Sequence, residues 1–260
     1  MERAGKITAQ VIGEVLARAE PGVNTWDLDQ FAEKRIRELG GEPGFKKVAG
    51  YDFATCININ EGLVHGIPTR DLIVKEGDIV SVDAGAFYGG FHTDSAWTKL
   101  VKGENPPAGP LRSEASEAGL KAKSYEEREG FLDVGIRALE RAIAQCRVGN
   151  FVGDISEAIQ SVVEGAGFSV VRDLVGHGVG RELHEDPQIP CFGVGGEGAQ
   201  LVVGMVLAIE VLYTWGNSGI DAADDGWTVV TKDRSLAAIF EKTVAITETG
   251  TRVVTKTLTL

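Results

Sequence analysis

The sequence predicts an α+β fold made of two related halves, in which strands from both halves meet in one curved sheet and helices cover one of its faces. The first observation is a repeat: after a shift of 127 positions, segment 77–83 coincides with segment 204–210, each a glycine followed by an apolar strand that ends in a carboxylate. The second observation is that this register stays constant over a helix, a cap and a turn, which indicates an ancient duplication. The other coinciding pairs are Ala17 with Ala144, Gly22 with Gly149, Asp27 with Asp154, and Gly40 with Gly167.

The first half is expected to contain two helices and three strands. Apolar residues recur at helical spacing over 7–16, and Pro21 with Gly22 ends that helix. A second helix is expected from about 26 to 40, where two glycines end it. Strand-like runs follow at 54–59, 79–87 and 91–101.

The second half repeats this order after a polar connection. Residues 103–127 are polar and charged, and they are expected to form a surface loop or an irregular helix start. Helical spacing resumes at about 128–147, and Asp154 followed three positions later by a glutamate resembles a capping box for a helix to about residue 165. After a glycine-rich stretch at 176–198, the last predicted strands are 206–214, 226–231 and 236–247.

Composition excludes several classes of protein. The 260 residues allow one large domain or two small ones, with 43% hydrophobic and 25% charged residues. A formal net charge of -12 argues against binding the phosphate backbone of DNA, which needs a cationic surface. Three widely spaced cysteines fit a reducing compartment. We find no apolar run long enough to span a membrane and no signal peptide, so we expect a cytoplasmic protein with no membrane partner.

Two carboxylates lie close together in a predicted hairpin. Asp83 stands in an apolar strand, where an isolated charge is costly, and Asp94 follows eleven residues later. A two-residue turn at Tyr88-Gly89 would place the two acids directly opposite each other. A turn at Gly89-Gly90 would shift the pairing by two residues and keep both acids on one face. In either case both carboxylates point into the same space.

Two further carboxylates and a histidine strengthen this pattern. Glu210 and Glu241 also stand in apolar strands, and His177 lies between glycines that allow close approach to a metal or substrate. Four carboxylates and one neutral imidazole around two divalent ions carry no net charge, which favours a two-metal site that activates water. For any single residue the alternative is simpler: an acid in a salt bridge or at a strand end, or a solvated loop histidine.

At these residues the sequence resembles the type I methionine aminopeptidases, which have the pita-bread fold shared with prolidase-like enzymes. The resemblance covers about 5–102 and 128–256. It is carried by His65-Gly66-Ile67-Pro68, Asp83 with Asp94, Gly176-His177-Gly178-Val179-Gly180 followed by His184-Glu185, Glu210, and Asp225-Gly226-Trp227-Thr228 before Glu241.

The resemblance implies how the chain is organised. A curved, mostly antiparallel sheet covered by helices would form a single catalytic domain over 1–260. Its pseudo-repeats would be about 1–102 and 128–260, and residues of about 103–127 would form a surface insertion between them.

The resemblance also implies an activity. The chain would be a metallo-exopeptidase, a methionyl aminopeptidase that removes the N-terminal methionine from nascent proteins or peptides whose second residue is small. Water activated by two divalent cations (cobalt, manganese, iron(II), zinc or nickel) would attack the first peptide bond. The implied metal ligands are Asp83, Asp94, His177, Glu210 and Glu241. Asp94 and Glu241 would bridge both ions, Asp83 would hold one ion, and His177 with Glu210 would hold the other.

The resemblance assigns further roles around the metals. Glu210 would take the proton of the water, His184 would stabilise the tetrahedral intermediate, and His65 would contact the scissile amide nitrogen or the substrate backbone. His92 is expected to support neighbouring groups or to be structural. The matching substrate-binding positions are His65, His184, Phe45, Tyr51, Cys56, Leu183, Leu212 and Trp227. Among them, Phe45 stands where the family often has cysteine, and Leu183 where it often has phenylalanine.

Nascent polypeptide N-termini at the ribosome are the implied partners, and the single-domain pattern suggests a monomer. Two alternatives stay open: an X-Pro aminopeptidase or dipeptidase of the same fold, and a metal-free binding pseudoenzyme. The X-Pro enzymes usually carry an additional N-terminal domain, and pseudoenzymes lose metal ligands, whereas this sequence has all five.

Overall fold

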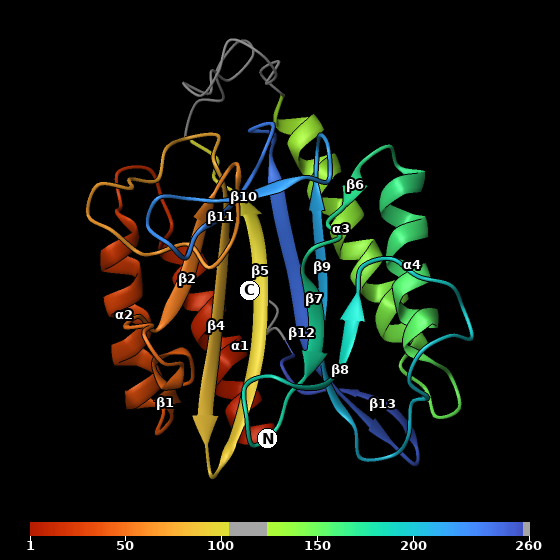
Figure 1. The fold of residues 1–260 in the computed structure, drawn as a ribbon. Helices are drawn as coiled ribbons and strands as arrows, with labels where there is room; N and C mark the ends of the chain where they lie inside the picture. Colours follow the sequence, from red (N-terminus) through yellow and green to blue (C-terminus); the bar gives the residue numbers. More distant parts are fainter. Residues whose placement is uncertain (104–123, 257–260) are drawn as a thin grey trace.

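Each half of the molecule packs helices against antiparallel strands, and the two halves lie side by side (Figure 1). The structure is a computed structural model, and it describes residues 1–103 and 124–256. None of the helices in these two ranges is long and apolar enough to cross a membrane. The predicted α+β architecture, with helices on one face of the strands, is confirmed.

The first half is built around a long hairpin. Helix α1 (Glu2–Arg18) packs on strands β4 (Ile79–Tyr88) and β5 (Phe91–Leu100), and α2 (Thr25–Glu38) packs beside α1. Apolar residues on the inner faces of both helices meet the apolar side of these strands and form one buried cluster. The two helices and the hairpin strands agree with the sequence prediction within a few residues.

The second half has the same plan. Helix α3 (Tyr125–Gln145) packs on β9 (Val206–Thr214) and β12 (Ala237–Thr247), and α4 (Val152–Gly165) packs against α3. The largest buried apolar cluster lies mainly in this half. The remaining elements are β1 (Glu42–Pro43), η1 (Phe45–Lys47), β2 (Thr55–Ile59), β3 (Gly62–Val64), β6 (Ser169–Val170), β7 (Val175–Gly178), β8 (Glu185–Pro190), β10 (Ile220–Ala222), β11 (Val229–Thr231) and β13 (Gly250–Val253).

The repeat seen in the sequence recurs in the structure. Helix α4 begins and ends 127 positions after α2, and β9 begins 127 positions after β4. Gly77 and Gly204 precede these two strands, and both adopt left-handed backbone conformations, with φ of 86° and 96°. This conformation favours glycine at both positions. A duplication of the chain would produce these coincidences.

Two helix starts differ from the prediction. Helix α3 begins at Tyr125 rather than near residue 128, because Ser124 and Glu127 form a capping box in which each side chain accepts from the backbone N–H of the other. The rest of the predicted insertion, residues 104–123, lies outside the described residues. In α4, Asp154 is not the N-cap: its carboxylate accepts from the N–H of Phe151 at 2.7 Å, so Phe151 stands at the cap.

The hairpin of β4 and β5 adopts the second of the two predicted turns. Tyr88 pairs with Phe91, which places Gly89 and Gly90 in the turn with φ of 60° and 84°. Positive φ at both positions matches the twist of a hairpin and requires residues such as glycine. Asp83 pairs with Ala96 and Asp94 with Gly85, so the two acids lie on the same face, offset by two residues.

The two halves meet along β5 and β12, which run side by side in the centre of Figure 1. The first-half sheet is β1-β4-β2 with β5 on β4, and the second-half sheet is β13-β12-β9-β7-β8 with β6 on β9. Among the described residues, no backbone ladder joins β5 to β12. The single curved sheet of the sequence prediction is therefore two antiparallel sheets, with β3, β10 and β11 in a third.

Two glycines of α3 give opposite predictions for stability. A methyl group on Gly135 would lie 2.5 Å from Phe240 and 2.6 Å from Tyr213, both fully buried, whereas a methyl group on Gly130 would meet nothing within 4 Å. We expect Gly135→Ala to destabilise the protein by about 1–3 kcal/mol through overpacking. Gly130→Ala should stabilise it by about 0.5–1 kcal/mol, because alanine orders more readily in a helix. Urea unfolding measures both changes, and shifts of the same sign would contradict this packing.

Candidate active site

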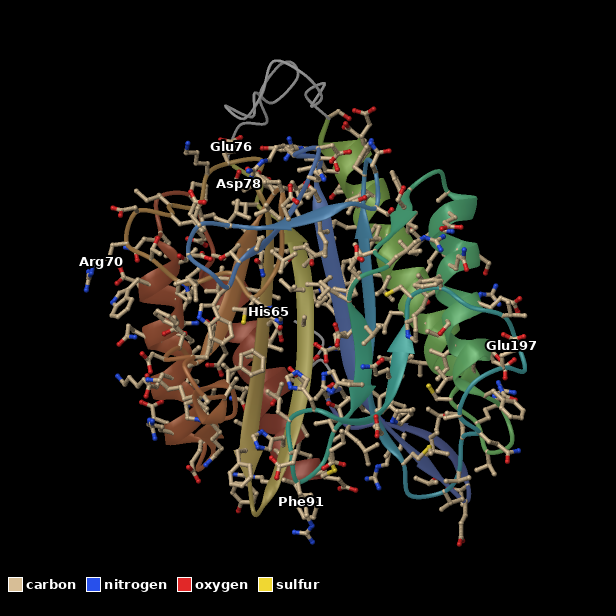
Figure 2. The ribbon with its side chains drawn as sticks, viewed as in Figure 1. His65, Arg70, Glu76, Asp78, Phe91 and Glu197 are labelled. Carbon is tan, nitrogen blue, oxygen red and sulfur yellow. The ribbon has the colours of Figure 1, made fainter. Side chains whose placement is uncertain are left out.

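A cavity of about 320 Å³ is lined by residues from both halves. Every residue that the sequence suggested for metal binding, catalysis or the methionine pocket lines this cavity. They are Phe45, Tyr51, Cys56, His65, Asp83, Asp94, His177, Leu183, His184, Glu210, Leu212, Trp227 and Glu241. Figure 2 shows His65 near the centre of the molecule, in front of the strands. The fold therefore gathers residues that are widely separated in the sequence.

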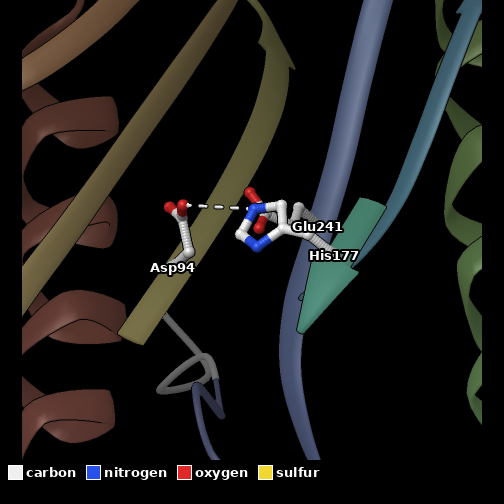
Figure 3. Close-up of side chains that lie close together, drawn as sticks. All are labelled: Asp94, His177 and Glu241. Atoms are coloured by element: carbon white, nitrogen blue, oxygen red, sulfur yellow. Dashed lines mark ion pairs between the residues drawn. The ribbon is translucent and has the colours of Figure 1, made fainter. Parts of the chain in front are cut away.

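Five ligand-type side chains occupy the floor of the cavity, each from a different strand. Asp83 and Asp94 come from the hairpin of the first half, and His177, Glu210 and Glu241 come from β7, β9 and β12. Ligand atoms of Asp94, His177 and Glu241 all lie within 4.8 Å of one another (Figure 3). The Nε2 atom of His177 is 3.5 Å from Oε1 of Glu210 and 3.9 Å from Oδ2 of Asp94.

The ladder of β9 and β12 fixes the position of the second pair of acids. Glu210 pairs directly with Glu241, so both side chains leave the sheet on the same face and next to each other. Like charges in this arrangement repel unless protons or a cation neutralise them. The two halves thus contribute one pair of acids each, and the pairs face each other across the cavity floor.

His177 is oriented as a metal ligand would be. Its Nδ1 lies 2.8 Å from the carbonyl oxygen of Gly178, so Nδ1 carries the hydrogen and donates it. The lone pair then lies on Nε2, which faces the carboxylates. Burial lowers the pKa of His177 to about 4, which keeps the ring neutral at physiological pH. A neutral imidazole with a free Nε2 is the form that binds a metal ion.

When no cation is bound, burial and mutual repulsion favour the protonated form of the four carboxyl groups. Burial, with the neighbouring acids as the next cause, raises the pKa values of Asp83, Glu210 and Glu241 well above the usual range of carboxyl groups. Burial also raises the pKa of Asp94, to about 7. A divalent cation would displace these protons, so its binding should weaken as the pH falls.

Unpartnered oxygen atoms mark the same place. Within residues 1–103 and 124–256, the buried atoms Oδ1 of Asp83, Oδ1 of Asp94 and Oε1 of Glu241 have no hydrogen-bond partner. Buried carboxylate oxygens are rarely left in this state, because losing water without a new partner is costly. Oxygen donors with one imidazole suit divalent ions such as manganese, iron, cobalt or zinc. The residues present therefore fit a divalent metal site.

Two histidines stand on the cavity wall above this floor. The ring of His184 lies with its centroid 4.4 Å from that of His177. His65 has a left-handed backbone, with φ of 57°, which is uncommon for a residue with a side chain. Burial lowers the pKa of both His65 and His184, and the nearby ring of His184 lowers the pKa of His65 further. Both rings are therefore neutral at physiological pH and can donate an N–H group to a substrate.

Another part of the cavity lining is apolar. Phe45, Tyr51, Cys56 and Leu183 form a separate buried cluster, and Trp227 packs on it with its ring 5.0 Å from that of Tyr51. The hydroxyl group of Tyr51 donates to the backbone oxygen of Thr55 at 2.8 Å and lies 3.1 Å from the sulfur of Cys56. This contact holds the ring in place, so the wall is preformed.

Some cavity residues were missed by the sequence analysis. Val48, Val64, Asp173, Leu174 and Val175 also line the cavity, and Asp173 is exposed there. Residues 173–175 lie directly before the glycine-rich motif of His177. This proximity in the chain could have indicated that they line the same cavity.

His92 does not line the cavity. Its backbone N–H donates to the carbonyl oxygen of Gly180 at 2.7 Å, and its buried ring packs on Phe87. The described contacts of His92 are therefore with Gly180 and Phe87, which lie outside the cavity lining.

Comparison with known proteins gives a consistent result. The family model described as metallopeptidase family M24 matches residues 1–248. Methionine aminopeptidase 1 of Bacillus subtilis (strain 168) is 41% identical over 256 residues, covering 98% of this chain and 95% of the relative. The methionine aminopeptidase of Clostridium acetobutylicum is 40% identical over 255 residues, covering 98% of this chain and 94% of the relative.

Solved structures agree. The crystal structure of methionine aminopeptidase from Thermotoga maritima has a TM-score of 0.89 and 42% identity, covering 98% of this chain and 95% of that one. Prolidase from Pyrococcus furiosus has a TM-score of 0.72 and 23% identity, covering 99% of this chain and 63% of that one. The likeness to the prolidase concerns the fold alone.

Proposed function

We propose a function for a chain that belongs to metallopeptidase family M24 and, within it, to the methionine aminopeptidases. It hydrolyses the peptide bond that follows an N-terminal methionine when the next residue is small. The observation that carries this proposal is the cavity itself, in which buried carboxylates with unpartnered oxygens lie beside a preformed apolar wall. A site for cations next to a site for a thioether side chain suits this substrate.

Five residues would hold two divalent cations. These residues are Asp83, Asp94, His177, Glu210 and Glu241, which together line one region of the cavity. When bound, such ions polarise a carbonyl group and lower the pKa of water. Two divalent charges balance four carboxylates around a neutral imidazole, and this balance supports the proposed number of ions. The donor set accepts manganese, cobalt, iron(II), zinc or nickel.

The remaining residues act on the substrate. Glu210 is one of the acids on the floor of the cavity and would accept the proton of the attacking water. The neutral ring of His184 would donate its N–H group to the oxyanion that forms at the scissile carbonyl. His65 would donate to the substrate backbone from the first half of the molecule.

The apolar wall would receive the methionine side chain. Phe45, Cys56 and Leu183 offer carbon and sulfur atoms that suit a flexible thioether. Leu212 and Trp227 would complete the pocket from the second half. The hydroxyl group of Tyr51 is engaged by Thr55 and Cys56, so its ring also presents an apolar face.

The proposal extends to the setting of the reaction. The substrates would be the N-termini of nascent polypeptides at the ribosome, and the enzyme would act as a monomer in the cytoplasm. Free, buried cysteines support a reducing compartment.

Release of free methionine tests the proposed function. Metal-stripped protein is reloaded with manganese, cobalt or iron(II) and given the peptide Met-Ala-Ser. We expect chelator-sensitive release that is at least about tenfold faster than from Met-Leu-Ser, because differences in side-chain size are worth this much in specificity. Metal binding without release of methionine, together with cleavage of X-Pro peptides, would favour the X-Pro hydrolases. Absence of metal binding would favour a pseudoenzyme.

A further inference from the structure

Side-chain hydroxyl groups of β5 and β12 bind backbone groups of the opposite strand. For residues 237–243, β12 has a ladder with β9 only, and β5 has a ladder with β4 only, so each strand presents an unpaired edge to the other. Unpaired backbone groups at a buried edge need other partners. Threonine and serine hydroxyl groups supply them here, and we define these contacts as the hydroxyl seam.

Two contacts of the hydroxyl seam hold the residues whose carboxylates face each other in Figure 3. The hydroxyl oxygen of Thr243 accepts from the N–H of Asp94 at 2.9 Å and donates to the carbonyl oxygen of Asp94 at 2.6 Å. The hydroxyl group of Ser95 donates to the carbonyl oxygen of Glu241 at 2.7 Å. Each half of the molecule thus fixes the backbone of an acidic residue in the other half.

We propose that Thr243 and Ser95 are positioning residues that set the separation of the Asp94 and Glu241 carboxylates, and thereby the affinity of the site for divalent cations. The proposal rests on the proposed function, because it takes these two acids to be metal ligands. Ligands that come from two separate sheets keep their spacing only as well as the sheets are held together. The hydroxyl seam holds the two sheets together at Asp94 and Glu241, where a shift of the backbone would directly move a carboxylate.

Burial strengthens this argument. Thr243 and Ser95 are both fully buried, so no solvent can replace their hydrogen bonds when a hydroxyl group is removed. Thr243 is itself held, because its N–H donates to the hydroxyl oxygen of Thr255 at 3.0 Å. The contact therefore joins Asp94 to a fixed point in the second half.

The seam also contains a matched control. The hydroxyl group of Thr98 accepts from the N–H of Ile239 at 3.2 Å and donates to the carbonyl oxygen of Ile239 at 2.6 Å. Thr98 is buried like Thr243 and binds its partner in the same two-way manner. Ile239 carries no ligand atom and does not line the cavity. Removing the hydroxyl group of either Thr243 or Thr98 should therefore destabilise the protein. Only the removal at Thr243 should also weaken the binding of metal.

The test is a titration of metal-stripped protein with Mn²⁺ by calorimetry, alongside thermal unfolding. We expect Thr243→Val, which keeps the shape but removes the hydroxyl group, to raise the Kd for Mn²⁺ by about tenfold or more, as loss of outer contacts does at other metal sites. Thr243→Ser keeps the hydroxyl group and should restore wild-type affinity. Thr98→Val should lower the unfolding temperature and leave the Kd unchanged.

Each other outcome overturns the proposal. Wild-type affinity in Thr243→Val, or an equal loss in Thr98→Val, would make the seam a purely structural join. If Thr243→Val does not fold, Ser95→Ala provides the same comparison from the other strand, and wild-type affinity in that variant would also overturn the proposal. If the wild-type protein binds no Mn²⁺, the ligand assignment in the proposed function fails, and this inference fails with it. Metal binding by the wild-type protein therefore separates the two failures.

Discussion

The Asp94→Asn variant should lose both bound metal and activity. Asn has nearly the same shape as Asp but is neutral, and its single amide oxygen binds a divalent cation more weakly than a carboxylate does. Asp94 stands between the two halves, within 4.8 Å of ligand atoms of His177 and Glu241. Loss of Lewis-acid stabilisation worth several kcal/mol predicts a decrease in kcat/KM of at least about a thousandfold. Metal analysis after dialysis and assays on Met-Ala-Ser measure the two effects.

Asp29→Asn is the matched control for this substitution. Asp29 is also fully buried, and burial also raises the pKa of its carboxyl group. Its Oδ1 atom accepts from Ala54 N and from both the N and the Oγ1 of Thr55, each at 2.9 Å. The amide oxygen of Asn can accept the same bonds, so metal content should not change. If Asp94→Asn kept its metal and its activity, Asp94 would not be a ligand.

The His184→Ala variant should keep its metal and lose turnover. His184 is not one of the five proposed ligands, and its ring lies beside that of His177 on the cavity wall. Removing one donor to a developing oxyanion lowers kcat by about 100- to 1000-fold. We expect KM for Met-Ala-Ser to change much less, because the donor acts mainly in the transition state. Steady-state kinetics with metal analysis checks both statements.

A second substitution at this position sharpens the result. His184→Asn retains an N–H donor on a shorter side chain and should recover part of the lost turnover. Loss of metal in His184→Ala would instead make the ring a ligand or a support for His177. Unchanged kcat would remove His184 from the proposed chemistry.

The sequence predicted the cavity residues better than it predicted their surroundings. The motifs around His65, His177 and Trp227 are short and local, so each could be recognised without the fold. Asp173 and its two neighbours carry no such motif, and only their place in the cavity lining distinguishes them. Their roles, like those of the motif residues, stay predictions until variants are measured.

Local signals had limits in the secondary structure as well. The capping box expected at Asp154 was wrong, because an acid near a helix start can be either the cap or the third residue of the helix. The hydrogen bond from the N–H of Phe151 to the carboxylate of Asp154 shows that Asp154 is the third residue of the helix. The hairpin turn was left between two alternatives, and the register of the whole β4–β5 ladder selected Gly89-Gly90.

The sequence by itself determined the four helices, the long strands and their order, but not most of the short strands. Helical spacing, apolar runs and glycines at turns act over a few residues, so they specify α1 to α4 and the long strands wherever these are placed. Their repetition after 127 positions also indicated that the halves would resemble each other.

Only the tertiary structure decided how the acids meet. Asp94 and Glu241 are far apart in the chain and belong to two sheets that share no backbone ladder in the part of the chain that the structure describes. The hydroxyl groups of Thr243, Ser95 and Thr98 make contacts between these sheets. Burial in the same place raises the pKa values of the carboxyl groups and leaves several of their oxygens without partners. Neither effect can be predicted from the local sequence, because both depend on residues that are close in space but distant in the chain.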